Sequence, residues 1–233
     1  MIFERIQEAL YFWRNHFAAL ALVVIPLSLL TTGVELFTGP ALLLPDPNGP
    51  AVINPAGAVW AILAPILMEA ALIPQLAAIQ AGRARGLGDC VLIALTTLPV
   101  LLAVNLVTSA AMFVGLMFLI LPGLWIYVRL SLAPFIVVLE SLPVRESLKQ
   151  SFVRTDSVQW PMLGAWLLLL LAVLSIVNIV GGLSMQLLGQ HAGTQLLTGV
   201  LLGLGAALTH VLLFRFYGLT RQNPDSTFGN KLH

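Results

Sequence analysis

Charge is what this sequence lacks most. Only 9% of its 233 residues are Asp, Glu, Lys or Arg, whereas 59% are hydrophobic. A soluble globular domain carries roughly 25% charged residues, so this chain has too few of them to cover a surface that faces water. The formal net charge of +1 gives no dense basic face, which argues against nucleic acid as a partner. The composition therefore predicts a membrane protein.

Cysteine is also scarce, and familiar catalytic motifs are missing. Cys90 is the single cysteine, so no disulfide can form within the chain and no cysteine-based metal cluster can assemble. The four histidines are scattered and lack the spacing of metal ligands. The sequence contains no HExxH, GxSxG or Walker motif. We therefore expect no metal, no cofactor, no catalytic residue and no enzymatic activity.

Long apolar runs, by contrast, are abundant. A bilayer core about 30 Å thick is crossed by a helix of about 20 apolar residues, and continuous runs favour helices over an alternating β-barrel. The sequence predicts an all-α polytopic membrane helical bundle of about six transmembrane helices, forming one domain over residues 1–233. We place the turn between the third and fourth spans near 111–115, with Leu121-Pro122-Gly123 as the alternative. The predicted spans are about 17–37, 56–79, 91–110, 115–139, 160–182 and 193–217.

The basic residues outside these spans fall only in alternate connections and at the chain ends. By the positive-inside rule, this segregation predicts that both termini are cytoplasmic. The connection at 38–55 is rich in proline, has Asp46 as its only charge, and is expected to be an extended, irregular loop without strands. The basic residues concerned are Arg5, Arg14, Arg83, Arg85, Arg145, Lys149, Arg154, Arg221 and Lys231, together with Arg215 at the inner end of the sixth span.

Two cytoplasmic segments are predicted to form short interfacial amphipathic helices. In Ile2–His16, four apolar residues recur at helical intervals between charged ones: Phe3, Ile6, Leu10 and Trp13. In Pro143–Arg154, Pro143 suits the start of a helix, and one face is predicted to carry Val144, Leu148 and Phe152.

Two ionisable residues are predicted to lie inside the bilayer, Glu69 near the middle of the second span and Arg129 near the middle of the fourth. Such residues are costly unless paired, which makes them good indicators of function. Their similar depth predicts that the two side chains pair. The pair would either form a polar site or proton relay, or fix the register of the helices.

Other polar and small residues within the spans have simpler expected roles. Asn105, Asn178 and His210 are each expected to form one interhelical hydrogen bond. Gly199 and Gly203 form a GxxxG motif, which permits close helix packing within the bundle or in a dimer.

One stretch carries a pattern that resembles a known family. Residues 121–140 read LPGLWIYVRLSLAPFIVVLE, and residues 146–151 read ESLKQS. This pattern resembles that of the YciC-like family of uncharacterised bacterial inner-membrane proteins. It is also similar to the membrane domain of some glycerophosphodiester phosphodiesterases, whose catalytic domain has no counterpart here. The resemblance implies a stand-alone module of the bacterial inner membrane and implies no activity. The positions that carry it are Pro122, Gly123, Arg129, Ser131, Glu140 and Ser151.

Together these features favour a non-enzymatic integral inner-membrane protein with a structural or envelope-maintenance role. Its expected partners are membrane lipids, a second copy of itself or other inner-membrane proteins. The alternative is a small permease or lipid-handling transporter that uses Glu69 and Arg129 as a midplane polar site. A polar cavity large enough for a substrate and holding both residues would favour this alternative, and a closed, dry bundle would count against it. An enzyme acting on lipid headgroups would need polar residues clustered at one membrane face, which the sequence does not show.

Overall fold

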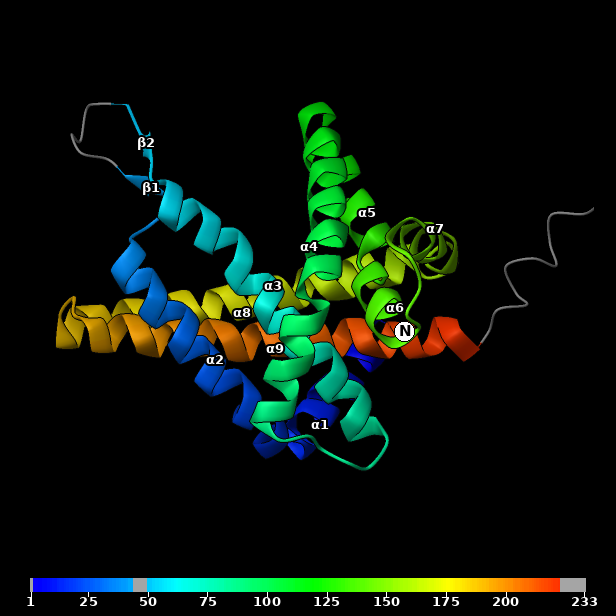
Figure 1. The fold of residues 1–233 in the computed structure, drawn as a ribbon, viewed down its shortest axis with the longest axis horizontal. Coiled ribbons are helices and arrows are strands. Elements are labelled where there is room, and N and C mark those ends of the chain that lie inside the picture. The colour runs from blue at the N-terminus through cyan, green and yellow to red at the C-terminus, as the bar shows by residue number, and fades with distance from the viewer. Residues whose placement is uncertain (1, 44–49, 223–233) are drawn as a thin grey trace, which may run out of the picture.

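The computed structural model describes residues 2–43 and 50–222, and these residues fold almost entirely into helices (Figure 1). Within this part of the chain, six helical stretches are long and apolar enough to cross a membrane. The prediction of an all-α membrane bundle is therefore confirmed. Asp46 of the predicted loop and Lys231 lie outside the described residues. The candidate spans are α2 (Phe17–Thr38), α3 (Pro55–Gln80), α4 (Leu87–Phe118), α5 (Ile120–Leu130) with α6 (Ala133–Leu139), α8 (Gln159–Leu188) and α9 (Ala192–Gln222).

The turn between the third and fourth spans lies outside 111–115 and close to the alternative, Leu121-Pro122-Gly123. Helix α4 runs without interruption through 111–115, although Gly115 lies in that range. The break is the single residue Leu119, which has extended backbone angles (φ −163°, ψ 157°). Pro122 then lies in the first turn of α5. Backbone N–H groups there have no acceptor within the helix, so the missing N–H of proline costs no helical hydrogen bond.

Glycines hold the two arms of this α4–α5 hairpin together. A Cβ atom placed on Gly115 would lie 2.8 Å from the Cα of Gly123, so the two backbones are in direct contact. In Figure 1 the α4–α5 pair runs vertically, whereas α8 and α9 lie side by side and run horizontally. The tips of these two hairpins therefore diverge, and α3 fills part of the space between them (Figure 1).

The proline-rich connection also differs from the prediction. It contains two short antiparallel strands, β1 (Leu42–Leu43) and β2 (Val52–Ile53), with Leu42 opposite Ile53. Leucine, valine and isoleucine on both sides of the loop favour this extended pairing. The side-chain amide of Asn54 donates hydrogen bonds to the carbonyls of Thr38, at 2.6 Å, and of Pro40, at 3.1 Å. These bonds tie the end of α2 to the start of α3, and we call this the hairpin end of the bundle.

The opposite, arginine-rich end is fastened by Gln75, which is fully buried. Its amide nitrogen donates to the carbonyl of Ala19 at 3.0 Å, and its amide oxygen accepts from the backbone N–H of Arg85 at 3.0 Å. The same oxygen receives the thiol of Cys90 at 3.5 Å. One side chain thus joins the start of α2, the end of α3 and the start of α4.

Both segments predicted to be amphipathic helices are helical, and in each the residues buried inside the protein are not the apolar residues named for the amphipathic face. Helix α1 (Ile2–Asn15) packs on α8 and α9 through Ala9 and Phe12, while Phe3 and Leu10 remain exposed. The guanidinium of Arg215 stacks on the Phe12 ring at 4.6 Å from its centroid, which fixes α1 against α9.

Helix α7 (Val144–Arg154) buries Ser147 and Ser151 completely, while Val144 and Leu148 are only partly buried. Hydroxyl contacts explain why the serine face of α7 is the buried one. The Ser151 hydroxyl donates to the carbonyl of Arg129 at 2.8 Å and accepts from the backbone N–H of Leu132 at 3.2 Å. Ser151 thereby satisfies backbone groups at the bend between α5 and α6.

Candidate functional site

Glu69 lies near the middle of α3, and its side chain is only 12% exposed. Two prolines inside the helix, Pro65 and Pro74, flank it. Pro65 has no N–H, so the carbonyl of Ala61 one turn earlier has no helical donor. The sequence therefore places a carboxylate beside a weakened stretch of backbone within a candidate span.

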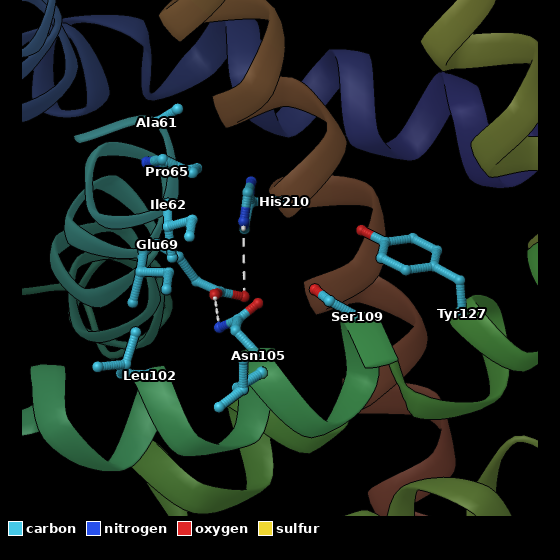
Figure 2. A pocket seen from close by; sticks show the side chains of 11 residues that line it. Ala61, Ile62, Pro65, Glu69, Leu102, Asn105, Ser109, Tyr127 and His210 are labelled. Atoms are coloured by element: carbon cyan, nitrogen blue, oxygen red, sulfur yellow. Dashed lines mark hydrogen bonds and ion pairs between the residues drawn. The ribbon is translucent and has the colours of Figure 1, made fainter. Parts of the chain in front are cut away.

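Residues of two other helices meet Glu69 (Figure 2). Asn105 of α4 donates its side-chain N–H to Oε2 of Glu69 at 2.7 Å, and also to the carbonyl of Leu101 at 3.1 Å. His210 of α9 places Nε2 at 3.8 Å from Oε1 of Glu69. Within the described residues, Oε1 accepts no hydrogen bond, so one oxygen of the carboxylate is left for a further donor.

The histidine is held in one tautomer by its own helix. Its Nδ1 lies 2.8 Å from the carbonyl oxygen of Ala206. A carbonyl can only accept, so Nδ1 carries the hydrogen and Nε2 is the nitrogen that gains or loses a proton. Nε2 of His210 and Oε1 of Glu69 therefore face each other at 3.8 Å, a distance longer than a hydrogen bond.

These three side chains line a cavity of about 390 Å³ between α3, α4, α5 and α9. The hydroxyls of Ser109 and Tyr127 point into it from the far side (Figure 2). Its rim is apolar and includes Ile62 and Leu106, which are 55% and 64% exposed. Glu69 is the only acidic residue in the lining, and no lysine or arginine lines it. The cavity is thus polar and acidic inside, with an apolar rim.

The predicted pairing of Glu69 with Arg129 is wrong. Arg129 lies near the end of α5, and its side chain turns toward the junction of α7 and α8. There Nη1 donates to Asp156 at 2.9 Å and to Gln159 at 3.2 Å. Equal depth does not ensure contact, because the rotation of each helix about its axis decides which neighbour a side chain meets.

Aromatic rings complete the surroundings of Arg129. Its guanidinium carbon lies 3.8 Å from the centroid of the Phe152 ring and 5.4 Å from that of Trp125. Trp125 itself donates to Gln159 at 2.8 Å. Arg129 is 4% exposed and contacts one carboxylate, one amide and two rings, so it fastens the α7–α8 junction onto α5. Its Nε has no hydrogen-bond partner among the described residues.

The other positions that carry the family resemblance also make internal contacts. Gly123 packs on Gly115, and Pro122 lies in the first turn of α5. Ser131 donates to the carbonyl of Val128 at 2.8 Å, where α5 ends. Ser151 caps the bend between α5 and α6, as described above. Together these residues build the bent fourth span and attach α7 to it.

Glu140 closes the same unit at the end of α6. It accepts two hydrogen bonds from the Arg154 guanidinium, at 2.6 and 2.8 Å, and one from the Tyr217 hydroxyl at 2.9 Å. The Arg154 hydrogen bonds, aided by the Tyr217 hydroxyl, hold the pKa of the Glu140 carboxyl below its ordinary value. The same hydrogen bonds raise the pKa of Arg154. Three elements, α6, α7 and α9, meet at this carboxylate.

Sequence reasoning named Asn105 and His210 only as isolated polar residues and overlooked Asp156. The interhelical hydrogen bond expected of Asn105 is present, and its acceptor is Glu69. Asn178, by contrast, bonds to the carbonyl of Leu174 in its own helix and is exposed. One usable signal was present: Glu69, Asn105 and His210 all lie well inside their spans.

Comparisons of the chain with protein-family models, curated proteins and solved structures find no match. The site must therefore be interpreted from its own geometry.

Proposed function

We propose that the protein is a small permease or lipid-handling transporter, in which Glu69, Asn105 and His210 bind the polar group of the ligand. The observation that supports this most strongly is Oε1 of Glu69, which accepts no hydrogen bond within the described residues and faces His210 at 3.8 Å inside a cavity of about 390 Å³. If arginine bound the Glu69 carboxylate, as the sequence predicted, a structural role alone would explain the presence of this residue. Here half of the carboxylate is left open toward a space the size of a small ligand pocket.

The ligand class follows from the charge of the lining. With His210 neutral, the cavity carries the single negative charge of Glu69 and no compensating cation. A positively charged group is therefore the complementary ligand. Such a group would compete with the proton on Nε2 of His210, because a cation beside the carboxylate disfavours an imidazolium beside it. Binding one monovalent cation to the form with a proton on Nε2 would then release that proton, whereas the neutral form would bind the cation without proton release, and no covalent step is involved.

The membrane and the orientation belong to the same proposal. The resemblance to YciC-like proteins supports a bacterial inner membrane. The positive-inside rule supports cytoplasmic placement of the arginine-rich end, which carries Arg83 and Arg85 beside Gln75 and Arg154 beside Glu140. The hairpin end, with β1 and β2, would then face outward.

A structural or envelope-maintenance role is the second candidate function. It is favoured by the motif positions, because Arg129, Ser131, Glu140 and Ser151 all act in internal packing. It differs from the first candidate in requiring neither a ligand nor a free oxygen on Glu69.

Two assays on purified protein in liposomes test the proposal and separate soluble from lipid ligands. The first applies Na⁺, K⁺ or tetramethylammonium gradients and follows internal pH with an enclosed dye. The second follows acyl-labelled phosphatidylethanolamine, which carries an ammonium headgroup, between the leaflets. We expect one probe to move, with Glu69→Gln reducing its rate at least tenfold. Asp89→Asn, an exposed acid at the start of α4, is the matched control and should keep the full rate.

Each outcome is informative. Cation-driven loss of internal protons supports a permease, whereas faster movement of the labelled lipid supports lipid handling. If neither probe moves faster with the wild-type protein than with Glu69→Gln, the transport proposal is wrong and the structural role takes its place.

A further inference from the structure

A second, larger cavity lies between α2, α3, α8 and α9, at the hairpin end of the bundle. Its volume is about 590 Å³. Its wall is largely apolar, but hydroxyl, amide and carboxylate groups are among the lining residues. On α2 and α9 these polar lining residues are Ser28, Thr31, Thr32, Glu35, Gln195 and Thr198.

The polar side chains that can face water in this space are those of Glu35, Gln195 and Thr198, which are exposed or partly exposed. Ser28 lies deeper: it is 1% exposed, and its Oγ packs against Gly203 of α9 with no hydrogen-bond partner in the described part of the chain. A space of about 590 Å³ with several polar groups in its lining is roomy enough to hold water.

The second cavity lies directly beside the first. Pro65 of α3 lines both of them. Ala206 of α9 lines the second cavity, and its carbonyl accepts the hydrogen bond from Nδ1 of His210 in the first. One turn of α3 and one turn of α9 therefore separate the second cavity from the Glu69–His210 pair.

The acidic residue of the second cavity gives this cavity a preference for cations over anions. Glu35 is exposed, lies in the last turn of α2, and belongs to the lining. No lysine or arginine lines the cavity. A carboxylate at a polar opening raises the local concentration of cations and lowers that of anions.

We infer that the second cavity is a water-filled vestibule through which protons and small hydrated cations reach the Glu69–His210 pair from the hairpin end. This inference rests on the proposed function and selects a soluble cation, in place of a lipid, as its ligand. Water along the Glu35, Gln195 and Thr198 wall would carry the proton that Nε2 of His210 releases.

Cysteine accessibility tests the vestibule without requiring transport. In a Cys90→Ala background, single cysteines replace Thr31, Thr32 or Thr198, and cationic and anionic methanethiosulfonate reagents of similar size are applied. The matched controls are Leu29→Cys and Leu30→Cys, neighbours on α2 whose side chains are 42% and 52% exposed on its lipid-facing side. A thiol reacts as its thiolate, which requires water, so the controls should stay unreactive despite their exposure.

We expect the vestibule positions to react at least tenfold faster than the controls, and faster with the cationic reagent than with the anionic one. Adding Glu35→Gln should abolish that preference. The side of entry is set by two markers: Leu42→Cys in β1 for the hairpin end and Lys149→Cys in α7 for the arginine-rich end. Vestibule positions should react only from the side that reaches Leu42→Cys.

Thr32→Cys and Thr198→Cys lie on two different helices, so the test still gives an answer if one of the two variants fails to fold. If both react as slowly as Leu30→Cys, the cavity is dry and the inference is wrong. Reaction from the Lys149→Cys side alone overturns it equally. Fast reaction together with failure of both liposome assays would leave the vestibule standing and remove only the proposed transport.

Discussion

Glu140 shows how one carboxylate can hold three elements together at the edge of the membrane. Its two oxygens receive both arms of the Arg154 guanidinium and the Tyr217 hydroxyl. The side chains of Glu140 and Arg154 are 19% and 22% exposed, so the pair is shielded from water more than a surface ion pair is. Replacing either partner leaves the other with unmet hydrogen bonds.

Glu140 should make the stability of the protein depend on pH at acidic values. Because its folded pKa is below the ordinary value, the unfolded chain binds more protons between the two pKa values, and stability rises with pH there. Glu140→Gln should therefore cost about 1–3 kcal/mol at neutral pH. The difference in apparent melting temperature between the two proteins in detergent should shrink as pH falls below about 4.5. A constant difference from pH 3 to pH 7 would contradict this assignment.

Gln75 is the polar residue whose loss should be most damaging at the arginine-rich end. Gln75→Leu keeps the volume but removes the partners of the Ala19 carbonyl and of the Arg85 N–H. Each buried group left unpaired costs about 1–3 kcal/mol, so a loss of at least that size is expected in unfolding titrations with dodecyl sulfate. Gln80→Leu, at the exposed end of the same helix, should be nearly neutral. Equal effects at the two positions would show that the Gln75 bonds contribute little.

At the level of whole elements, hydropathy reliably predicts which segments are helical but does not predict where a helix breaks. Hydrocarbon allows only backbone that is hydrogen-bonded within its own helix, so the long apolar runs had to be helical. The break at Leu119, however, occurs in a run of methionine, phenylalanine, leucine and isoleucine that contains no turn residue. It is fixed by the contact between Gly115 and Gly123, a tertiary feature that hydropathy does not reveal.

Helices α2 and α9 pack through the GxxxG motif predicted from the sequence. A Cβ atom on Gly203 would collide with the Ser28 hydroxyl, and one on Gly199 would collide with the Thr32 hydroxyl. Both glycines therefore face α2 inside the bundle.

Gly203→Ala should destabilise the protein by about 1–3 kcal/mol, because it overpacks this contact. Ser28→Ala combined with Gly203→Ala should recover part of the loss by removing the colliding oxygen. Gly182→Ala, where a Cβ atom would meet nothing within 4 Å, should be neutral or slightly stabilising in the same melting experiment. No recovery in the double variant would mean that another contact limits the approach of the helices.

For the whole molecule, what the sequence can predict is limited because the solvent around the helices is lipid. Burial in lipid dictates how many helices cross, but it leaves open how each is rotated. The sequence pointed to Glu69 because a charge is costly in hydrocarbon. Its partners Asn105 and His210 could not be identified in the same way, because helix packing brings them to Glu69. Asp156, the partner of Arg129, lies between α7 and α8 and is 56% exposed, so no span pointed to it.

The fourth crossing is the one on which the topology depends most. It has 20 residues, the fewest of the six candidates, and a turn at Ser131–Leu132 divides it into α5 and α6. At about 1.5 Å per residue, it spans about 30 Å only if both pieces lie across the membrane. If they do, an odd number of spans separates Leu43 from Gln222, so these two points face opposite sides.

Alkaline phosphatase inserted after Leu43 and green fluorescent protein fused after Gln222 should therefore both be active in a bacterial host, because the first matures outside the cytoplasm and the second inside it. Exchanging the two reporters is the control, and both should then be inactive. If α5–α6 only dipped into the membrane, the exchanged and original pairs would each show one active reporter. The Lys149→Cys marker would then locate the fault, because α7 would be labelled from the same side as β1.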